Sequence, residues 1–270
     1  MTKKILPFKE IPKTVWLLIP INFAGIFAIY TFLKDDVSYW WLVAIVIGYI
    51  LQKEIGISAG YHRLFSHYSY TVSRPIKLFI LWCGLIAGQG SPYWWAALHR
   101  GYHHKHSDTD KDPHSPIHGF WHSYILWLFK IKEKDISTRY IIDLIRDKDL
   151  SLAHKHYLII FFLSHCFVAA IDINLWLFFM ALPAFLTLHS YCLQTSLQHL
   201  GKFGYRSFET NDQSMNNLAI FPIVLGDAWH NNHHADPGNP NFGKRWWEID
   251  TTYLLIRLMS SSHKSNASAN

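Results

Sequence analysis

Histidine is concentrated in three short segments of this sequence, and their imidazoles suit metal binding. Residues 99–108 read HRGYHHKHSD, an earlier segment reads HRLFSH, and a later one reads HNNHH. With one further histidine in the segment QHLG, nine candidates arise: His62, His67, His99, His103, His104, His199, His230, His233 and His234. Neutral imidazole suits iron, zinc, copper and nickel. Because nine ligands are too many for one ion, the sequence predicts two metal ions.

The spacing within each segment predicts which histidines share a face. On a helix, residues three, four or five apart can face a common point, with three and four the best placed. His99 is therefore expected to lie with His103, and His230 with His233 and His234. His62 and His67 are five apart and need a slightly extended turn. By the same rule His106, two positions after His104, is predicted to point elsewhere.

Motifs narrow the choice of metal without fixing it. The sequence contains no HExxH, the common zinc-peptidase motif. It also contains no ExxH, which argues against a carboxylate-bridged di-iron bundle. An almost all-histidine ligand set leaves the metal charge largely uncompensated. That could favour iron that activates oxygen, but charge alone does not exclude zinc.

The composition indicates a membrane protein. The chain is 50% apolar and only 16% charged, with four long apolar runs that reach about the 20 residues needed to span a bilayer. The expected spans cover residues 15–33, 39–60, 155–172 and 175–197. A shorter run at residues 76–88 predicts a buried or interfacial helix.

Basic residues predict the orientation of these spans. The runs are expected to pair as two hairpins, with Lys and Arg gathered in the N-terminal tail, the middle segment and the C-terminal part. By the positive-inside rule, the termini and the middle segment then face the cytoplasm. All nine histidines fall on that side. The net charge of +6 suits membrane lipids rather than nucleic acid as a partner.

The chain is therefore expected to be a single domain, an all-α integral membrane protein with a cytoplasmic cap. The cap would comprise residues 61–154 and 198–258, and residues 259–270 would form a flexible tail. Within the cap, residues 120–131 and 139–150 mix apolar and charged faces, which predicts helices lying on the membrane surface.

Three segments together resemble a known family. GYHRLFSH, HRGYHHKHSDTDKDPHSP and GDAWHNNHHADP are similar to the three histidine boxes of the membrane fatty-acyl desaturases, the stearoyl-CoA desaturase-like group. The similarity runs from about residue 57 to residue 258 and includes KRWWEIDTTYLLIRLM. The resemblance implies four spans, a cytoplasmic cap, a tunnel for an acyl chain, and a di-iron centre held by the nine histidines. Zinc could replace iron in overproduced protein.

The resemblance also implies a reaction. Desaturases of this group use O2 to remove two hydrogens from adjacent methylenes of a fatty acyl chain, with two electrons supplied from outside. The sequence shows no fused haem domain, no flavin or nicotinamide fingerprint and no cysteine set for an iron–sulfur cluster. A separate ferredoxin-like or cytochrome-type electron donor is therefore expected.

The sequence departs from the family pattern at three places. Three residues separate His99 from His103, where the acyl-CoA enzymes usually have two. Ala97 and Leu98 replace an Arg-Asp pair of the animal acyl-CoA enzymes, which counts against a CoA carrier. Thr195 stands where relatives have an asparagine that holds a metal-bound water, and its hydroxyl could still hold water.

Several side chains near the boxes have two readings. Four carboxylates either orient imidazoles by accepting the second ring N–H or cap loops: Asp108, Asp112, Asp227 and Asp236. Trp94, Trp95 and Phe65 either line the acyl tunnel or, slightly favoured, anchor the chain at the membrane interface.

Two other functions remain open at this stage. One is a hydroxylase of the same superfamily, acting on a lipid or alkyl chain. The other, which the three-box pattern disfavours, is a zinc protein such as a membrane hydrolase or a metal-handling protein.

Overall fold

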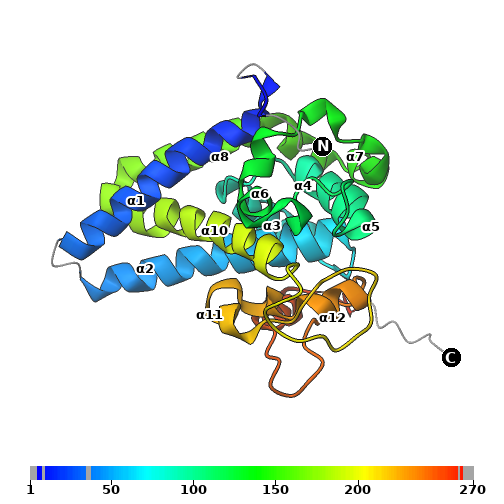
Figure 1. Ribbon diagram of the computed structural model, residues 1–270. Helices are drawn as coiled ribbons and strands as arrows, with labels where there is room; N and C mark the ends of the chain where they lie inside the picture. Colours follow the sequence, from blue (N-terminus) through cyan, green and yellow to red (C-terminus); the bar gives the residue numbers. More distant parts are fainter. Residues whose placement is uncertain (1–4, 8–9, 35–37, 261, 264–270) are drawn as a thin grey trace.

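Four long helices lie side by side and extend from a cap of shorter helices in the computed structural model (Figure 1). The structure describes residues 5–7, 10–34, 38–260 and 262–263. The long helices are η2 with α1 (Lys13–Leu17, Leu18–Lys34), α2 with η3 (Tyr39–Tyr49, Ile50–Ser66), α8 (Lys148–Ile171), and α9, η9 and α10 (Ile173–Leu175, Trp176–Ala181, Leu182–Leu197). All four are long and apolar enough to cross a membrane, as the sequence predicted.

Two of these helices are longer than expected. The second continues to Ser66, because its later turns are buried in the cap and no longer need to be apolar. The third begins at Lys148, where the Asp147 carboxylate caps it by accepting the N–H groups of Asp149 and Leu150. Residues 148–150, expected in a separate surface helix, therefore belong to α8.

The fourth helix is central in the bundle. The stretch from Ile173 to Leu197 is the most buried of the four, whereas α8 is the least buried. Both α1 and α2 pack along η9 and α10. The end of α10 therefore enters the cap from the middle of the bundle.

The cap is built from short helices on both sides of α8 in the sequence. Its histidine-bearing elements are α4 (Pro92–Leu98), η4 (His99–His103), α5 (His104–His106) and α12 (His230–Ala235). Around them lie α3 (Arg74–Ile86), η5 (Pro116–His118), α6 (Phe120–Tyr124), η6 (Leu126–Phe129), η7 (Glu133–Asp135), η8 (Thr138–Ile141), α7 (Ile142–Ile145), η10 (Leu218–Ile220), α11 (Phe221–Val224), η11 (Leu225–Ala228) and α13 (Thr251–Met259). The expected surface helices at 120–131 and 139–150 are thus broken into single turns.

The contact between η3 and α3 is close because it is made through glycine. A Cβ at Gly56 would lie 2.5 Å from the Cys83 carbonyl carbon, and one at Gly84 would lie 2.4 Å from the Tyr61 ring. Ile80, Cys83 and Ile86 are buried on the face of α3 that meets the core. The run at 76–88 is therefore largely a buried helix, one of the two predicted possibilities.

A short pair of strands joins the C-terminal part to the first histidine segment. β1 (Tyr70–Thr71) pairs antiparallel with β2 (Ser262–His263), with Tyr70 opposite His263. Two residues of the predicted flexible tail are thus hydrogen-bonded to the cap. Residues 261 and 264–270 of that tail lie outside the described residues.

Candidate metal centre

Wide helical turns bring histidines five residues apart onto one face. The π-helical segment η3 contains His62 and is followed directly by His67, whose N–H donates to the His62 carbonyl at 3.2 Å. In η4 the His104 N–H likewise donates to the His99 carbonyl. Such π-type turns are rare and often occur at functional sites. They supply the extended turn that the spacing of His62 and His67 required.

The nine predicted histidines gather into two clusters, within each of which the candidate ligand atoms lie within 4.8 Å of one another. We call the first cluster site A, which comprises His62, His67, His99, His104 and His233. We call the second cluster site B, which comprises His103, His199, His230 and His234. Most of these side chains are buried. His106 belongs to neither cluster in the described part of the chain, as its spacing predicted.

The structure corrects the predicted pairing within the segments. His99 lies with His104 in site A rather than with His103, because the π-type turn advances five residues instead of four. His230 lies with His234 in site B, whereas His233 lies in site A. Adjacent residues on a helix point to different sides. The neighbours His103 and His104 therefore lie in different clusters, and so do His233 and His234. The second and third histidine segments therefore each contribute to both sites.

Carboxylates fix the tautomers of three rings in site B. His103 Nδ1 lies 3.0 Å from Asp112, His199 Nδ1 lies 3.2 Å from Asp108, and His234 Nδ1 lies 2.7 Å from Asp212. An ionised carboxylate only accepts hydrogen bonds, so each Nδ1 carries the proton. Each Nε2 then presents a lone pair toward the middle of the cluster.

The facing nitrogen atoms are too close to be left without a cation or a proton between them. His230 Nε2 lies 2.9 Å from His199 Nε2 and 3.1 Å from His234 Nε2. In site A, His233 Nε2 lies 2.9 Å from both His62 Nε2 and His104 Nε2, and His67 and His99 approach to 2.8 Å. Neutral imidazoles can share a metal ion in this arrangement, and the ion would offset the repulsion of their lone pairs. The donor set fits one ion in each cluster.

Burial keeps these imidazoles neutral, as metal ligation requires. It lowers the pKa of His103 to about 3, and it lowers the pKa values of His99, His104, His230 and His233. Burial alone would also lower the pKa of His199, but the hydrogen bond and the charge of Asp108 raise it above its ordinary value. The five rings whose pKa burial lowers can therefore offer lone pairs at neutral pH.

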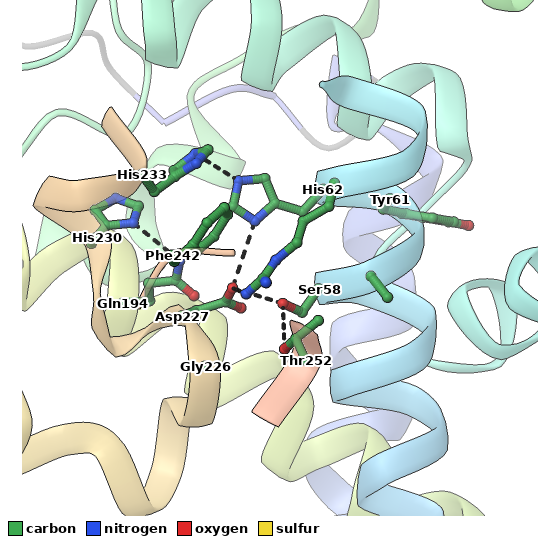
Figure 2. A network of polar contacts seen from close by, with 12 residues as sticks. Ser58, Tyr61, His62, Gln194, Gly226, Asp227, His230, His233, Phe242 and Thr252 are labelled. Atoms are coloured by element: carbon green, nitrogen blue, oxygen red, sulfur yellow. Dashed lines mark hydrogen bonds and ion pairs between the residues drawn. The ribbon is translucent and has the colours of Figure 1, made fainter. Parts of the chain in front are cut away.

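The four predicted carboxylates have different roles. Asp108 and Asp112 orient imidazoles directly, as described above. Asp227 Oδ1 lies 3.7 Å from His62 Nδ1 (Figure 2). Lys53 Nζ lies 2.6 Å from the other oxygen of Asp227. Asp236 instead accepts a hydrogen bond from the Asn239 side-chain amide and lies 3.6 Å from Lys244 Nζ. It therefore stabilises a loop, and the prediction that it orients an imidazole is wrong.

Three residues that support the site are not among those predicted from the sequence. Asp212, in the loop after α10, orients His234 and has no motif around it that could have revealed its role. His114 is buried with its Nδ1 2.5 Å from Asp112, so Asp112 is shared by two rings. The Gln194 amide nitrogen lies 3.4 Å from His230 Nδ1 (Figure 2). His114 lies in the sequence DPHSP, shortly after the second histidine segment. This position was the one sequence signal that His114 could support the site.

A buried network of charges holds η3 against the third histidine segment. Arg63 donates to Asp250 at 2.7 Å and to Asp227 at 3.2 Å, and Ser58 donates to Asp227 at 2.7 Å. Figure 2 shows the contacts that run from His62 through Asp227 and Ser58 to Thr252. Since breaking a buried ion pair costs about 3–5 kcal/mol, this network strongly fixes His62 relative to α12.

A narrow apolar cavity lies beside the histidine pocket and shares wall residues with it. Trp94, Trp95 and Leu188 line it, and Trp95, Tyr191 and Thr195 also line the pocket that contains four of the histidines. The slightly favoured reading of Trp94, Trp95 and Phe65 as interfacial anchors is wrong, because all three are buried in the core. The Thr195 hydroxyl is close to the Tyr191 and Cys192 carbonyl oxygens, at 3.3 and 3.2 Å.

Four helices that are long and apolar enough to cross a membrane, together with a buried, two-part histidine cluster that could hold metal ions, define the class to which this chain is compared. The fatty acid desaturase family model matches residues 37–264, so this chain belongs to the fatty acid desaturase family and is an oxidoreductase. The resemblance seen in the sequence is thereby confirmed.

Curated relatives agree with this assignment over most of the chain. The sn-1 stearoyl-lipid 9-desaturase of Anabaena variabilis is 32% identical over 86% of this chain and 85% of its own length. The Delta-9 acyl-lipid desaturase 1 of Arabidopsis thaliana is 34% identical over 88% of this chain and 78% of its own length. An acyl-CoA C20 Delta5-desaturase of Anemone leveillei is also 34% identical, over 82% of this chain and 70% of its own length.

Proposed function

We propose that this protein is a membrane-embedded desaturase that introduces a double bond at carbon 9 of a lipid-linked acyl chain. The observation that carries the proposal is that the apolar cavity and the pocket lined by His62, His99, His103 and His230 share three wall residues, Trp95, Tyr191 and Thr195. A flexible alkyl chain entering this cavity would bring its methylenes beside both clusters. Positional control of this kind is the main contribution that a protein makes to such chemistry.

The proposed ligands are the nine histidines of sites A and B, and the proposed metal is iron. When bound, two iron ions would activate O2 and supply the oxidising power for removal of two hydrogens. The chain's own residues would hold the substrate, orient the imidazoles through Asp108, Asp112 and Asp212, and exclude water with Trp94 and Trp95. Electrons would come from a separate ferredoxin-like or cytochrome-type donor.

The membrane setting of the proposal is supported by the outward faces of the long helices. Phe23 on α1 is 74% exposed and Phe167 on α8 is 68% exposed, and many neighbours on these helices are exposed and apolar. Contiguous apolar surface of this extent is costly in water but suits contact with lipid chains. We propose that the helices insert as two hairpins with the cap on the cytoplasmic side.

Two observations favour a lipid as the carrier of the acyl chain. Two of the similar relatives described above are named for acyl-lipid substrates and for position 9. In this chain Ala97 and Leu98 are buried and apolar, so they offer a CoA headgroup no charge at the place of the Arg-Asp pair. A polar pocket of the cap, which contains Lys111 and Lys130, shares Trp127 with the apolar cavity and would receive the polar end of the substrate.

The proposal is tested by lipid profiling of cells with and without the protein. We expect membrane lipids whose acyl chains are two hydrogens lighter, with the new bond located at carbon 9 by fragmentation. Products one oxygen heavier would identify a hydroxylase instead, and unchanged lipids in cells with active donor proteins would contradict the proposal. Metal analysis of active protein should give about two iron ions per chain, whereas zinc in active protein would contradict the choice of iron.

A further inference from the structure

The two histidine clusters differ in what orients their rings. In site B, carboxylates accept the Nδ1–H of three rings, as described above. In site A, the Nδ1 atoms of His99 and His233 are buried and have no hydrogen-bond partner among the described residues. A ring without such a partner is held through its backbone and by packing. The position of His99 therefore depends on what fixes the turn that carries it.

The guanidinium of Arg100 caps the helix end that precedes His67. Its Nε donates to the Ser66 carbonyl at 2.7 Å, and its Nη2 donates to the Phe65 carbonyl. Carbonyl groups in the last turn of a helix lack partners within the helix, and a cationic side chain there also suits the helix dipole. Arg100 follows His99 directly, and the two capped residues precede His67. The guanidinium therefore joins the backbones beside two ligands of site A.

The same guanidinium also contacts the residue after His67. Tyr68 has a φ of 51°, a left-handed conformation that is uncommon for an aromatic residue. The Arg100 Cζ lies 4.7 Å from the centroid of the Tyr68 ring, within range of a cation–π contact. The Tyr68 hydroxyl donates to Asp143, whose carboxylate oxygens lie 2.9 and 3.0 Å from Arg100 Nη1. One side chain thus fixes the backbone on both sides of His67.

Arg100 is itself held firmly in this position. Its Nη1 also donates to the Tyr140 carbonyl at 3.1 Å, and only 16% of its side chain is exposed. Hydrogen bonds from a charged donor that is shielded from water are stronger than an exposed surface ion pair. The planar fork of donors reaches several acceptors at once, which the single ammonium of a lysine does not match. The guanidinium therefore restricts how far the turns of His67 and His99, whose Nε2 atoms lie 2.8 Å apart, can separate.

We propose that Arg100 is a positioning residue for site A, which holds His67 and His99 at the spacing that a shared metal ion requires by joining the backbones beside them. The inference rests on the metal centre of the proposed function but not on its substrate or reaction. Loss of the guanidinium should weaken metal binding at site A. It should leave site B intact, because carboxylates orient the rings there.

The test uses the purified full-length protein, freed of metal and titrated with Co²⁺, whose absorption spectrum reports its ligands and geometry. For Arg100→Gln we expect about 10- to 100-fold weaker Co²⁺ binding at site A, the usual cost of losing a residue that orients a metal ligand. The Co²⁺ that this variant retains against a chelator should have the spectrum of site B. A spectrum of site A, or equal weakening of both sites, would contradict the proposal.

Reference spectra for the two sites come from double variants. His67→Ala combined with His99→Ala removes two ligands of site A and leaves site B. His199→Ala combined with His230→Ala removes two ligands of site B and leaves site A. Unchanged protein without a second Co²⁺ site would contradict the proposed metal centre itself, rather than the role of Arg100 within it.

Tyr102→Phe is the matched control for a general loosening of η4. The Tyr102 hydroxyl donates to the Asp135 carbonyl at 2.8 Å and accepts from the Ser137 N–H at 3.1 Å, so it fastens η4 to the same neighbouring segment without capping η3. This variant should bind Co²⁺ at both sites as the unchanged protein does. If it weakened site A as much as Arg100→Gln, the proposal would be wrong.

Arg100→Lys carries the test if Arg100→Gln does not fold. It keeps the charge but loses the fork, so we expect the same selective weakening of site A to a smaller extent. Co²⁺ binding at site A as tight as in the unchanged protein would show that the fork is not needed. Failure of both variants to fold would also contradict the proposal, because Arg100 would then support the whole fold rather than site A.

Discussion

Carboxylates behind the imidazoles distinguish site B from site A at the scale of single residues. Three rings of site B donate Nδ1–H to Asp108, Asp112 and Asp212. In site A the nearest equivalent is Asp227, 3.7 Å from His62. Carboxylate partners fix the orientation of a metal-binding imidazole and make it more basic. An ion in site B would therefore have more of its charge compensated than an ion in site A.

Asp212 provides a direct test of this support. Asp212→Asn keeps the size of the side chain but removes its charge, so we expect about 10- to 100-fold weaker metal binding at site B. The matched control is Asp236→Asn, because Asp236 lies beside the same histidine segment but contacts Asn239 and Lys244. Metal retained during titration with a chelator measures the effect. Equal losses in the two variants would show that Asp212 has no special role.

His99 and His106 test the ligand assignment in the second histidine segment. His99 is buried in site A, so His99→Ala should lose metal and nearly all product formation. His106 is in neither cluster among the described residues, so His106→Ala should keep its metal and most of its turnover. Metal content and product yield are measured in both variants side by side. An active His99→Ala together with an inactive His106→Ala would reverse the assignment.

The elements explain why the sequence predicted which histidines gather but not how they divide into two clusters. Apolar length alone indicated the four long helices, and residue type alone indicated the nine histidines. The grouping depends on π-type turns at η3 and η4, which nothing in the local composition of HRGYHH distinguishes from ordinary helix. Asp212 was missed for a related reason, because a loop brings it to His234 from 22 positions away in the sequence.

The contact between η3 and α3 makes the position of His62 sensitive to a single methyl group. In Gly56→Ala, the new Cβ would lie 2.5 Å from the backbone of Cys83 and Gly84, which cannot rotate away as a side chain can. Overpacking of this kind costs about 1–3 kcal/mol, so we expect a lower apparent unfolding temperature and weaker metal binding. Ala170→Val, on an exposed part of α8, is the control. A Gly56→Ala protein as stable as the control would mean that the two helices can separate without cost.

At the scale of the whole molecule, both histidine clusters lie at the cap end of the bundle. α2 with η3 and α10 each lead into the cap, where η4, α5 and α12 complete the two sites. Figure 1 shows the long helices extending to one side and α4, α5 and α12 on the other. If the long helices span a bilayer, one membrane face carries both clusters and the pocket for the polar end of the substrate. The electron donor must then reach that same face.

Orientation in the membrane therefore decides which compartment supplies the electrons. Basic residues are enriched near both termini and between the second and third spans, which predicts that these parts are cytoplasmic. Epitope tags at either terminus, or after Lys134 in the exposed turn η7, should be reached only from the cytoplasmic side of sealed vesicles. A tag at Asp35, which lies outside the described residues between α1 and α2, should be reached only from the opposite side. If the tag after Lys134 were accessible only from the opposite side, the cap would be reversed. Cytoplasmic ferredoxin-like or cytochrome-type donors could then not reduce the clusters.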